Sequence, residues 1–178
     1  MTPSVFGYPV QGKIMDDIIF KPIGLIRTQF VDIEGMPIQS VGAEGNQGIV
    51  ELHPEYVMGL QDIEGYSHLI LIYQFHLSKD YDLLVRPFLD SQLRGVFSTR
   101  APRRPNPIGL STVRLLAVKG NILEIEGVDI VDKTPLLDIK PFVSHFDNRY
   151  DTKNGWLSDK QVEARLKRSD GRFGGGSE

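Results

Sequence analysis

The sequence predicts a mainly β protein, a small closed or nearly closed β-barrel with one or two short helices. Six or seven short runs of apolar and β-branched residues are separated by turn residues, a pattern typical of small barrels and sandwiches. These runs do not alternate with helical patterns, and no Gly-x-Gly-x-x-Gly motif follows a strand. A doubly wound nucleotide-binding sheet is therefore not expected.

The first third of the chain supplies four of the expected elements. Residues 18–27 are apolar and β-branched, which predicts a strand, and Pro22 within them indicates an edge or a bulge. Residues 32–48 contain four glycines and a proline, so we expect a long loop, and such loops often carry function. A short strand at 47–52 and a short helix at 54–60 follow.

The strongest strand pattern is 68–76, in which both alternating faces are largely apolar. This strand is therefore expected to be central in the sheet. It becomes polar at its end, at Gln74 and His76. Residues 80–93 are ambiguous, because Pro87 interrupts an apolar spacing that would otherwise favour a helix.

The clearest hairpin joins 109–118 to 122–126 through Lys119-Gly120-Asn121. Glycine and asparagine tolerate the positive φ angles of tight turns, so these two residues predict the reversal of the chain. Three further elements are expected, two strands and a short helix: 128–131, 136–142 and 159–167.

Composition excludes several classes of protein. The 178 residues include no cysteine, which excludes disulfides, thiolate catalysis and cysteine-ligated metal centres. No apolar run approaches the ~20 residues that cross a bilayer, and the N-terminus lacks the pattern of a signal peptide, so we expect a cytoplasmic protein without a membrane partner. One barrel domain with two tails is expected: 17–142, with an N-terminal arm at 1–16 and a C-terminal extension at 143–178 that ends in a flexible glycine-rich stretch.

Charge and histidine spacing limit the ligands. The net charge is −3, so any contact with nucleic acid must depend on a local basic patch. Six arginines fall close together and form such a patch or a solvated positive face: Arg86, Arg94, Arg100, Arg103, Arg104 and Arg114. The four histidines show no spacing typical of metal ligands, and no metal site is expected: His53, His68, His76 and His145.

The segment 97–110 has the features of a preorganised binding loop. Three prolines stiffen its backbone and push the preceding residues toward extended geometry: Pro102, Pro105 and Pro107. Arginine forks bind carboxylates and phosphates, and asparagine presents both a donor and an acceptor. The loop holds four such side chains, although a rigid connector with solvated arginines has the same pattern: Arg100, Arg103, Arg104 and Asn106.

At this loop the sequence resembles the TsaA-like tRNA N6-threonylcarbamoyladenosine methyltransferases. The family motif Thr-Arg-Ser-Pro-x-Arg-Pro-Asn-Pro-Ile-Gly is matched by Thr99 to Gly109, with Ala101 in place of serine. Lys133 replaces a frequent glycine. Three other ordered blocks also match, so that the resemblance covers about two-thirds of the chain: 23–28, 59–69 and 132–141.

The resemblance implies a β-barrel enzyme that uses S-adenosyl-L-methionine, usually as a homodimer with the cofactor near the subunit interface. Its substrate is then tRNA, at the threonylcarbamoyladenosine next to the anticodon (position 37). Bacterial members often have a further C-terminal domain. Because only 37 residues follow Pro141, the compact single-domain type is expected.

The resemblance also assigns residues. Nine are implied to contact the cofactor: Gln39, Ser40, His76, Leu77, Arg100, Leu110, Gly127, Val128 and Asp129. Arg103 and Arg104 are expected to bind tRNA phosphate or the threonyl carboxylate. Arg104 and Asn106 are also expected at the reacting end of the acceptor. Asp138 is a candidate base for the N6 proton.

Two other functions agree with the sequence. A barrel methyltransferase with a small-molecule acceptor is one, because a fold and a cofactor site do not determine the acceptor. The other is a non-enzymatic RNA-binding barrel that uses the segment 97–110, which we call the arginine loop. A measurement of cofactor binding distinguishes the RNA-binding barrel from both methyltransferases. Analysis of tRNA nucleosides distinguishes the tRNA methyltransferase from the one with a small-molecule acceptor.

Overall fold

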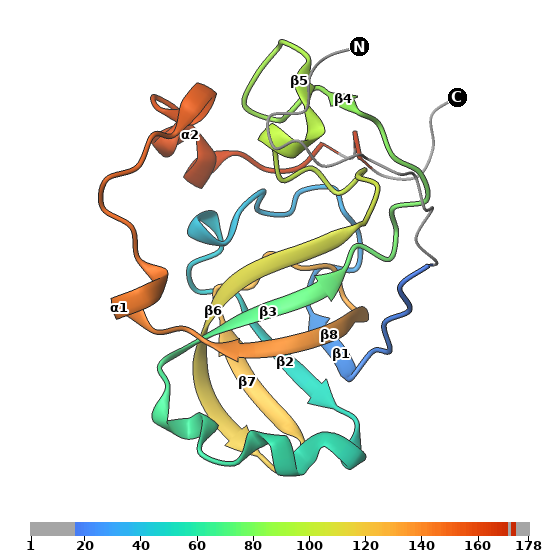
Figure 1. The fold of residues 1–178 in the computed structure, drawn as a ribbon, viewed down its shortest axis with the longest axis vertical. Helices are drawn as coiled ribbons and strands as arrows, with labels where there is room; N and C mark the ends of the chain where they lie inside the picture. The colour runs from blue at the N-terminus through green and yellow to red at the C-terminus, as the bar shows by residue number, and fades with distance from the viewer. Residues whose placement is uncertain (1–16, 171, 174–178) are drawn as a thin grey trace, which may run out of the picture.

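The structure, a computed structural model, describes residues 17–170, 172 and 173, and within them six strands close into a barrel (Figure 1). Around the barrel the order is β1-β2-β7-β6-β3-β8, and every neighbouring pair is antiparallel. The strands are β1 (Gly24–Thr28), β2 (Gln47–Leu52), β3 (His68–Gln74), β6 (Ile108–Lys119), β7 (Ile122–Glu126) and β8 (Thr134–Pro141). The predicted small barrel is thereby confirmed. The predicted arm at 1–16 and most of the glycine-rich end lie outside the described residues.

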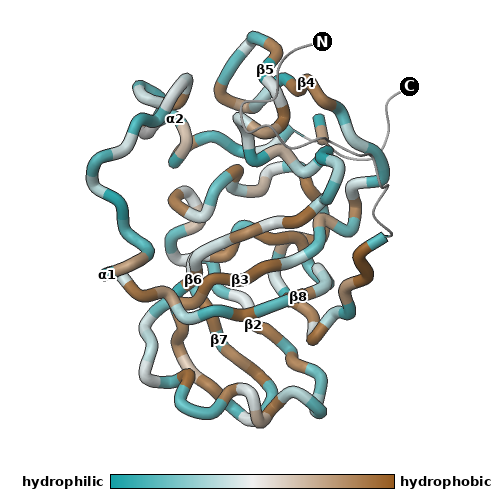
Figure 2. The backbone as a smooth tube through the Cα atoms, viewed as in Figure 1, coloured by the Kyte–Doolittle hydropathy of each residue, from teal (hydrophilic) through white to brown (hydrophobic). Residues whose placement is uncertain are grey.

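Strand alternation places one side of each strand inside the barrel. In β3, Leu69, Leu71 and Tyr73 are buried, whereas Ile70 and Ile72 on the outer side are half-buried. Figure 2 shows the apolar residues concentrated along the barrel strands. Further buried core residues come from the other five strands: Ile26, Val50, Leu52, Val113, Leu123, Ile125 and Leu136.

Two predicted strands differ from the structure. β1 begins at Gly24 rather than at residue 18, and Pro22, which has no N–H to donate to a ladder, lies just outside it. The predicted strand at 128–131 is absent from the described elements. Val128 and Ile130 are nevertheless buried, because they pack into the core cluster at the end of the barrel. Their apolar character reflects this burial and not pairing in the sheet.

The ambiguous region 80–93 contains no helix. Instead β4 (Leu84–Val85) pairs with β5 (Arg94–Gly95) in a separate two-stranded sheet. Val85, Val96 and Phe173 form a second, smaller core with Ala101. This core joins the C-terminal extension to the arginine loop.

The helices are short. The predicted segment at 54–60 is the 3-10 helix η2 (Pro54–Leu60), and the predicted helix near 159–167 is α2 (Gln161–Leu166). The other helices are η1 (Ser40–Gly42), η3 (Ile63–Gly65), η4 (Val96–Ser98), α1 (Ser144–Asp147) and η5 (Gly155–Leu157). Each helix in the described part of the chain falls short of the length and apolarity that a bilayer crossing requires.

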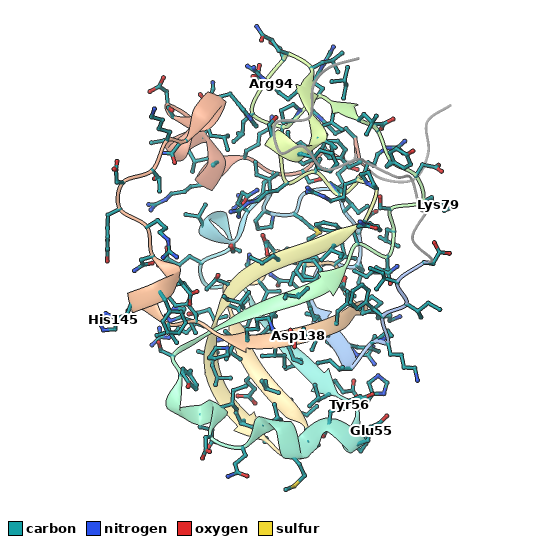
Figure 3. The ribbon with its side chains drawn as sticks, viewed as in Figure 1. Glu55, Tyr56, Lys79, Arg94, Asp138 and His145 are labelled. Carbon is teal, nitrogen blue, oxygen red and sulfur yellow. The ribbon has the colours of Figure 1, made fainter. Side chains whose placement is uncertain are left out.

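One end of the barrel, which we call the rim, collects the long connections. Because the strands are antiparallel, the ends of β1, β3 and β7 meet the starts of β2, β6 and β8 there. The β4–β5 sheet and α2 lie at this end, and η2, with Glu55 and Tyr56, lies at the opposite end (Figures 1 and 3). The C-terminal extension packs on the long loop, since the backbone N–H groups of Gly35 and Ser169 donate to Ser169 and Met36 at 2.9 and 2.8 Å.

Candidate functional site at the barrel rim

Three polar side chains at the rim form a hydrogen-bonded chain. Ser111 of β6 donates to the Asp129 carboxylate, with 2.7 Å between Oγ and Oδ1. The Tyr73 hydroxyl lies 3.0 Å from the same Ser111 Oγ. Since the single hydroxyl proton of Ser111 is given to Asp129, Tyr73 must be the donor in the second bond. The chain therefore runs from Tyr73 through Ser111 to Asp129.

Gly109 makes room for Tyr73. The two residues are partners across the β3–β6 ladder. A Cβ atom at position 109 would lie 2.2 Å from Cε2 of the Tyr73 ring, so no larger residue fits beside that ring. The ring also packs edge-on against Phe75, with 5.5 Å between ring centroids. The glycine that ends the family motif is thus explained by the aromatic ring on the neighbouring strand.

Burial and one cation control the charge at this cluster. Burial raises the pKa of the Asp129 carboxyl, and the Ser111 hydrogen bond, the Asp129 backbone N–H and the Arg100 guanidinium partly oppose this. Burial, followed by the Asp129 charge, raises the pKa of Tyr73 far above its usual value. Arg100 is itself exposed and donates from Nη1 to Oε1 of Gln39 at 3.2 Å. Gln39, Arg100 and Asp129, all predicted as cofactor contacts, are therefore brought together.

His76 lies at the same rim, just beyond β3. Its Nδ1 is 3.3 Å from Oγ1 of Thr134, whose own proton is donated to the Val131 carbonyl at 2.7 Å. The ring proton is therefore on Nδ1, and Nε2 is an acceptor. Burial lowers the pKa of His76, partly opposed by the Asp132 carboxylate. His76 is therefore neutral at neutral pH.

Three hydrogen bonds tie the arginine loop to residues 78–82, and another residue of the loop bonds to the loop's own backbone. Ser78 Oγ donates to the Pro102 carbonyl at 3.1 Å, and Arg103 Nε donates to Asp82 Oδ2 at 2.7 Å. The backbone N–H of Asp82 returns a bond to the Arg103 carbonyl at 3.3 Å. Arg104 reaches inward, to the Thr99 and Ala101 carbonyls at 3.4 and 3.5 Å. Arg103, predicted to bind substrate, thus also ties the loop to residues 78–82.

This ion pair gives a prediction for Arg103. If Arg103 acts by holding the loop, Asp82→Ala should lower the methyl transfer to tRNA that the family resemblance implies by the same factor as Arg103→Ala. Both should change the free energy of unfolding by about 1 kcal/mol or less, because the Asp82 side chain is half exposed. Initial rates with tRNA and denaturant titrations measure the two quantities. A loss with Arg103→Ala alone would instead assign the guanidinium to the substrate.

Five of the other predicted site residues lie on the connections at the rim. Gly127 has a positive φ of 85° and its N–H donates to the Asn46 carbonyl at 2.9 Å, which leads the chain into Asp129. Four further predicted residues also lie along the rim connections: Ser40 at the start of η1, Leu77 after β3, exposed Asn106, and buried Val128.

Asp138 and Leu110 lie on the outside of the barrel. Both are partners of Ile72, from opposite sides of β3, so the three side chains form a row across the wall. Asp138 forms an ion pair with Lys140, with 2.7 Å between Nζ and Oδ2. Figure 3 shows Asp138 on this wall, formed by β8. The structure does not join Asp138 to the chain of Tyr73, Ser111 and Asp129.

Sequence reasoning missed Tyr73 and Ser111. Strand alternation was the available signal, because Gly109, Ser111 and Val113 share one side of β6, and a serine between buried positions needs a partner. A cavity of about 480 Å³ lies elsewhere, between the β4–β5 connection and α2. Among the described residues, no group of three or more potential metal ligands is found.

Comparison with known proteins points to a common family. The model of the tRNA-methyltransferase O N-terminal domain matches residues 25–148. A probable S-adenosyl-L-methionine-binding protein of Pyrococcus abyssi is 51% identical over 156 residues, which cover 88% of this chain and 85% of the relative. A mouse tRNA (adenine(37)-N6)-methyltransferase is 33% identical over 141 residues, 74% of this chain and 32% of the relative.

Solved structures agree with these relatives. A crystal structure of TrmO matches with a TM-score of 0.68 and 39% identity, over 79% of this chain and 64% of that one. A TrmO structure from Pseudomonas aeruginosa matches with a TM-score of 0.67 and 36% identity, over 79% and 63%. The chain therefore spans somewhat less than two-thirds of the solved structures it matches.

Proposed function

The chain belongs to the tRNA-methyltransferase O N-terminal domain family, and from this premise we propose that it is an S-adenosyl-L-methionine-dependent tRNA methyltransferase. We propose N6 of the threonylcarbamoyladenosine at position 37, next to the anticodon, as the acceptor. The names of the relatives from Pyrococcus abyssi and mouse support the cofactor and the adenine N6 position. The observation on this chain that carries the proposal is the presence at one rim of the Arg100 guanidinium, held by Gln39, and of the half-buried Asp129 carboxylate, whose charge Arg100 favours.

The rim fits the cofactor by its charges. The methionine end of S-adenosyl-L-methionine carries a carboxylate, an ammonium and a sulfonium. Arg100, which Gln39 holds, suits the carboxylate, and Asp129 suits a cationic group. The other implied contacts are five residues along the rim connections and one on the outer wall: Ser40, His76, Leu77, Gly127 and Val128, with Leu110 on the wall. When bound, the cofactor supplies an already activated methyl group, so the protein mainly has to align it with the acceptor.

The arginine loop is proposed to hold the acceptor. Its three prolines and the Arg103–Asp82 ion pair preorganise it, so little conformational entropy is lost on binding. Arg103 and Arg104 would bind anticodon-loop phosphate or the threonyl carboxylate, and Asn106 would hydrogen-bond the modified base. Asp138 is the proposed base for the N6 proton, acting from the outer wall beside Leu110.

A homodimer would bring the outer wall into the site. Leu110 is 55% exposed and Ile108 39% exposed, beside half-buried Ile72 on the same wall. Burying this apolar strip against a second copy would place the wall that carries Asp138 at the interface. We propose that the enzyme acts as a homodimer and that it does so in the cytoplasm, where its tRNA substrate is found.

The decisive test is mass spectrometry of tRNA nucleosides after incubation with isotopically labelled cofactor. We expect the label in N6-methylated threonylcarbamoyladenosine. Label found only in a small-molecule acceptor would show that this molecule, and not tRNA, is the substrate. Failure to bind the cofactor in calorimetry would overturn the enzyme assignment and favour an RNA-binding barrel.

Arg104→Ala is expected to abolish detectable methyl transfer while leaving the fold intact. The Arg104 side chain reaches back to two carbonyls of its own loop, so its loss removes a cation at the acceptor site and few packing contacts. Methyl transfer to tRNA and thermal unfolding are measured together. Arg149→Ala is the matched control, because Arg149 is an exposed arginine outside the motif and the basic patch whose side chain also reaches two backbone carbonyls. Undiminished transfer by Arg104→Ala would contradict the assignment.

A further inference from the structure

We propose that Tyr73 and Ser111 are positioning residues that orient the Asp129 carboxylate toward the cationic end of the cofactor. This inference rests on the proposed function and adds two side chains to it. Neither residue touches the reacting atoms in this proposal. Both act through Asp129, by fixing one of its oxygens.

The first step is the direction of the hydrogen bonds. Asp129 Oδ1 accepts from Ser111 at 2.7 Å, and Ser111 Oγ accepts from Tyr73 at 3.0 Å. Donors aligned in one direction polarise one another, so each bond strengthens the next. The chain therefore holds Oδ1 firmly, and in this proposal Oδ2 is the oxygen that accepts from a ligand.

The second step is the rigidity of the two donors. Tyr73 and Ser111 are 4% and 2% exposed and lie on paired strands of the barrel wall. Gly109 lets the Tyr73 ring lie flat across β6, at a distance that any Cβ atom would prevent. Asp129, by contrast, lies in the connection between β7 and β8. The sheet thus provides a fixed reference for a carboxylate that its own loop would hold less well.

The third step is the shared electrostatics. The Arg100 guanidinium opposes the rise in the pKa of both Asp129 and Tyr73, so this cation favours the ionised carboxylate at the end of the hydrogen-bonded chain. The side chains of all three chain members are hydrogen-bonded in this arrangement, and no buried side-chain nitrogen or oxygen among the described residues lacks a partner. A cationic ligand that arrives at Asp129 meets an acceptor already in place and loses little energy in reorganising it.

The test compares Ser111→Ala, Ser111→Thr and Tyr73→Phe in the full chain. We expect Ser111→Ala to weaken S-adenosyl-L-methionine binding about tenfold to a hundredfold, because it removes a hydrogen bond to a charged group. Tyr73→Phe should weaken it less, about threefold to tenfold, and Ser111→Thr should restore most of the affinity. Thr112→Ala, which removes a hydroxyl from the next residue of β6, and Tyr66→Phe, at an exposed tyrosine, are the matched controls.

Two further readouts distinguish positioning from a purely structural role. With Ser111→Ala, the pH at which cofactor binding is half-maximal should rise, since the Ser111 hydrogen bond favours the ionised carboxylate. The KM for the cofactor should rise more than kcat falls. Thermal unfolding shows whether Ser111→Ala folds, and Tyr73→Phe serves as the independent variant if it does not.

The outcomes are separable. Wild-type protein that binds the cofactor, together with Ser111→Ala and Tyr73→Phe proteins that bind it equally well with an unchanged pH dependence, would overturn the inference and leave the proposed function standing. Wild-type protein that does not bind the cofactor would overturn both.

Discussion

Gly109→Ala is expected to destabilise the protein by about 3 kcal/mol, near the upper end of the usual cost of overpacking a core. The added methyl group would lie 2.2 Å from Cε2 and 2.4 Å from Cζ of Tyr73, and the ring has no space to retreat because it is buried against Phe75. Displacing the ring would also break its bond to Ser111. Cofactor affinity should therefore fall along with stability, as measured by denaturant titration and calorimetry.

A double-mutant cycle tests the cause. In a Tyr73→Ala background the methyl group at position 109 meets no ring, so the added cost of Gly109→Ala should nearly disappear. Gly59→Ala is the matched control, because a Cβ at that position would meet no atom within 4 Å beyond its own helix backbone and chain neighbours. An equal cost of Gly109→Ala in both backgrounds would show that the ring is not the reason for this glycine.

The same pair of residues shows how far sequence reasoning reaches. Strand alternation and turn chemistry are local, and they predicted the barrel, the hairpin of β6 and β7, and β2 with its observed bounds. Gly109 was recognised only as part of a motif. Its physical reason is Tyr73, which lies 36 positions earlier and becomes its neighbour only through the β3–β6 register. Register is a tertiary property that local patterns do not specify.

One incorrect expectation and two features that the sequence did not reveal have related causes. Val128 and Ile130 have the apolar spacing of a strand, but burial at the end of a barrel produces the same spacing without pairing. The ion pair of Arg103 with Asp82, 21 positions away, was not predicted, because nothing local in the sequence indicates that partner. Asp129 was predicted from family resemblance alone. Its environment, set by Ser111, Tyr73 and Arg100, follows from the fold.

Asp129→Asn is expected to weaken cofactor binding about a hundredfold at neutral pH, since losing one member of a buried charge pair commonly costs 2–5 kcal/mol, roughly thirtyfold or more. In the wild-type protein, affinity for a cationic group should rise with pH as the Asp129 carboxyl ionises. Burial raises the pKa of this carboxyl, so the rise should occur above the usual range of an aspartate. The asparagine variant should lose this pH dependence.

Stability should change in the opposite direction. An aspartate whose pKa is higher in the folded than in the unfolded state costs stability as pH rises from its unfolded pKa through its folded pKa. Asp129→Asn removes this cost, so the variant should be more stable than the wild type at neutral pH and similar at acidic pH. Glu55→Gln, an exposed change at the opposite end of the barrel, should alter neither property (Figure 3). If the variant binds cofactor poorly and also unfolds more readily at neutral pH, Asp129 supports the fold and is not held ionised for a ligand. If the variant is more stable, the Asp129 charge costs stability that only a bound cation offsets.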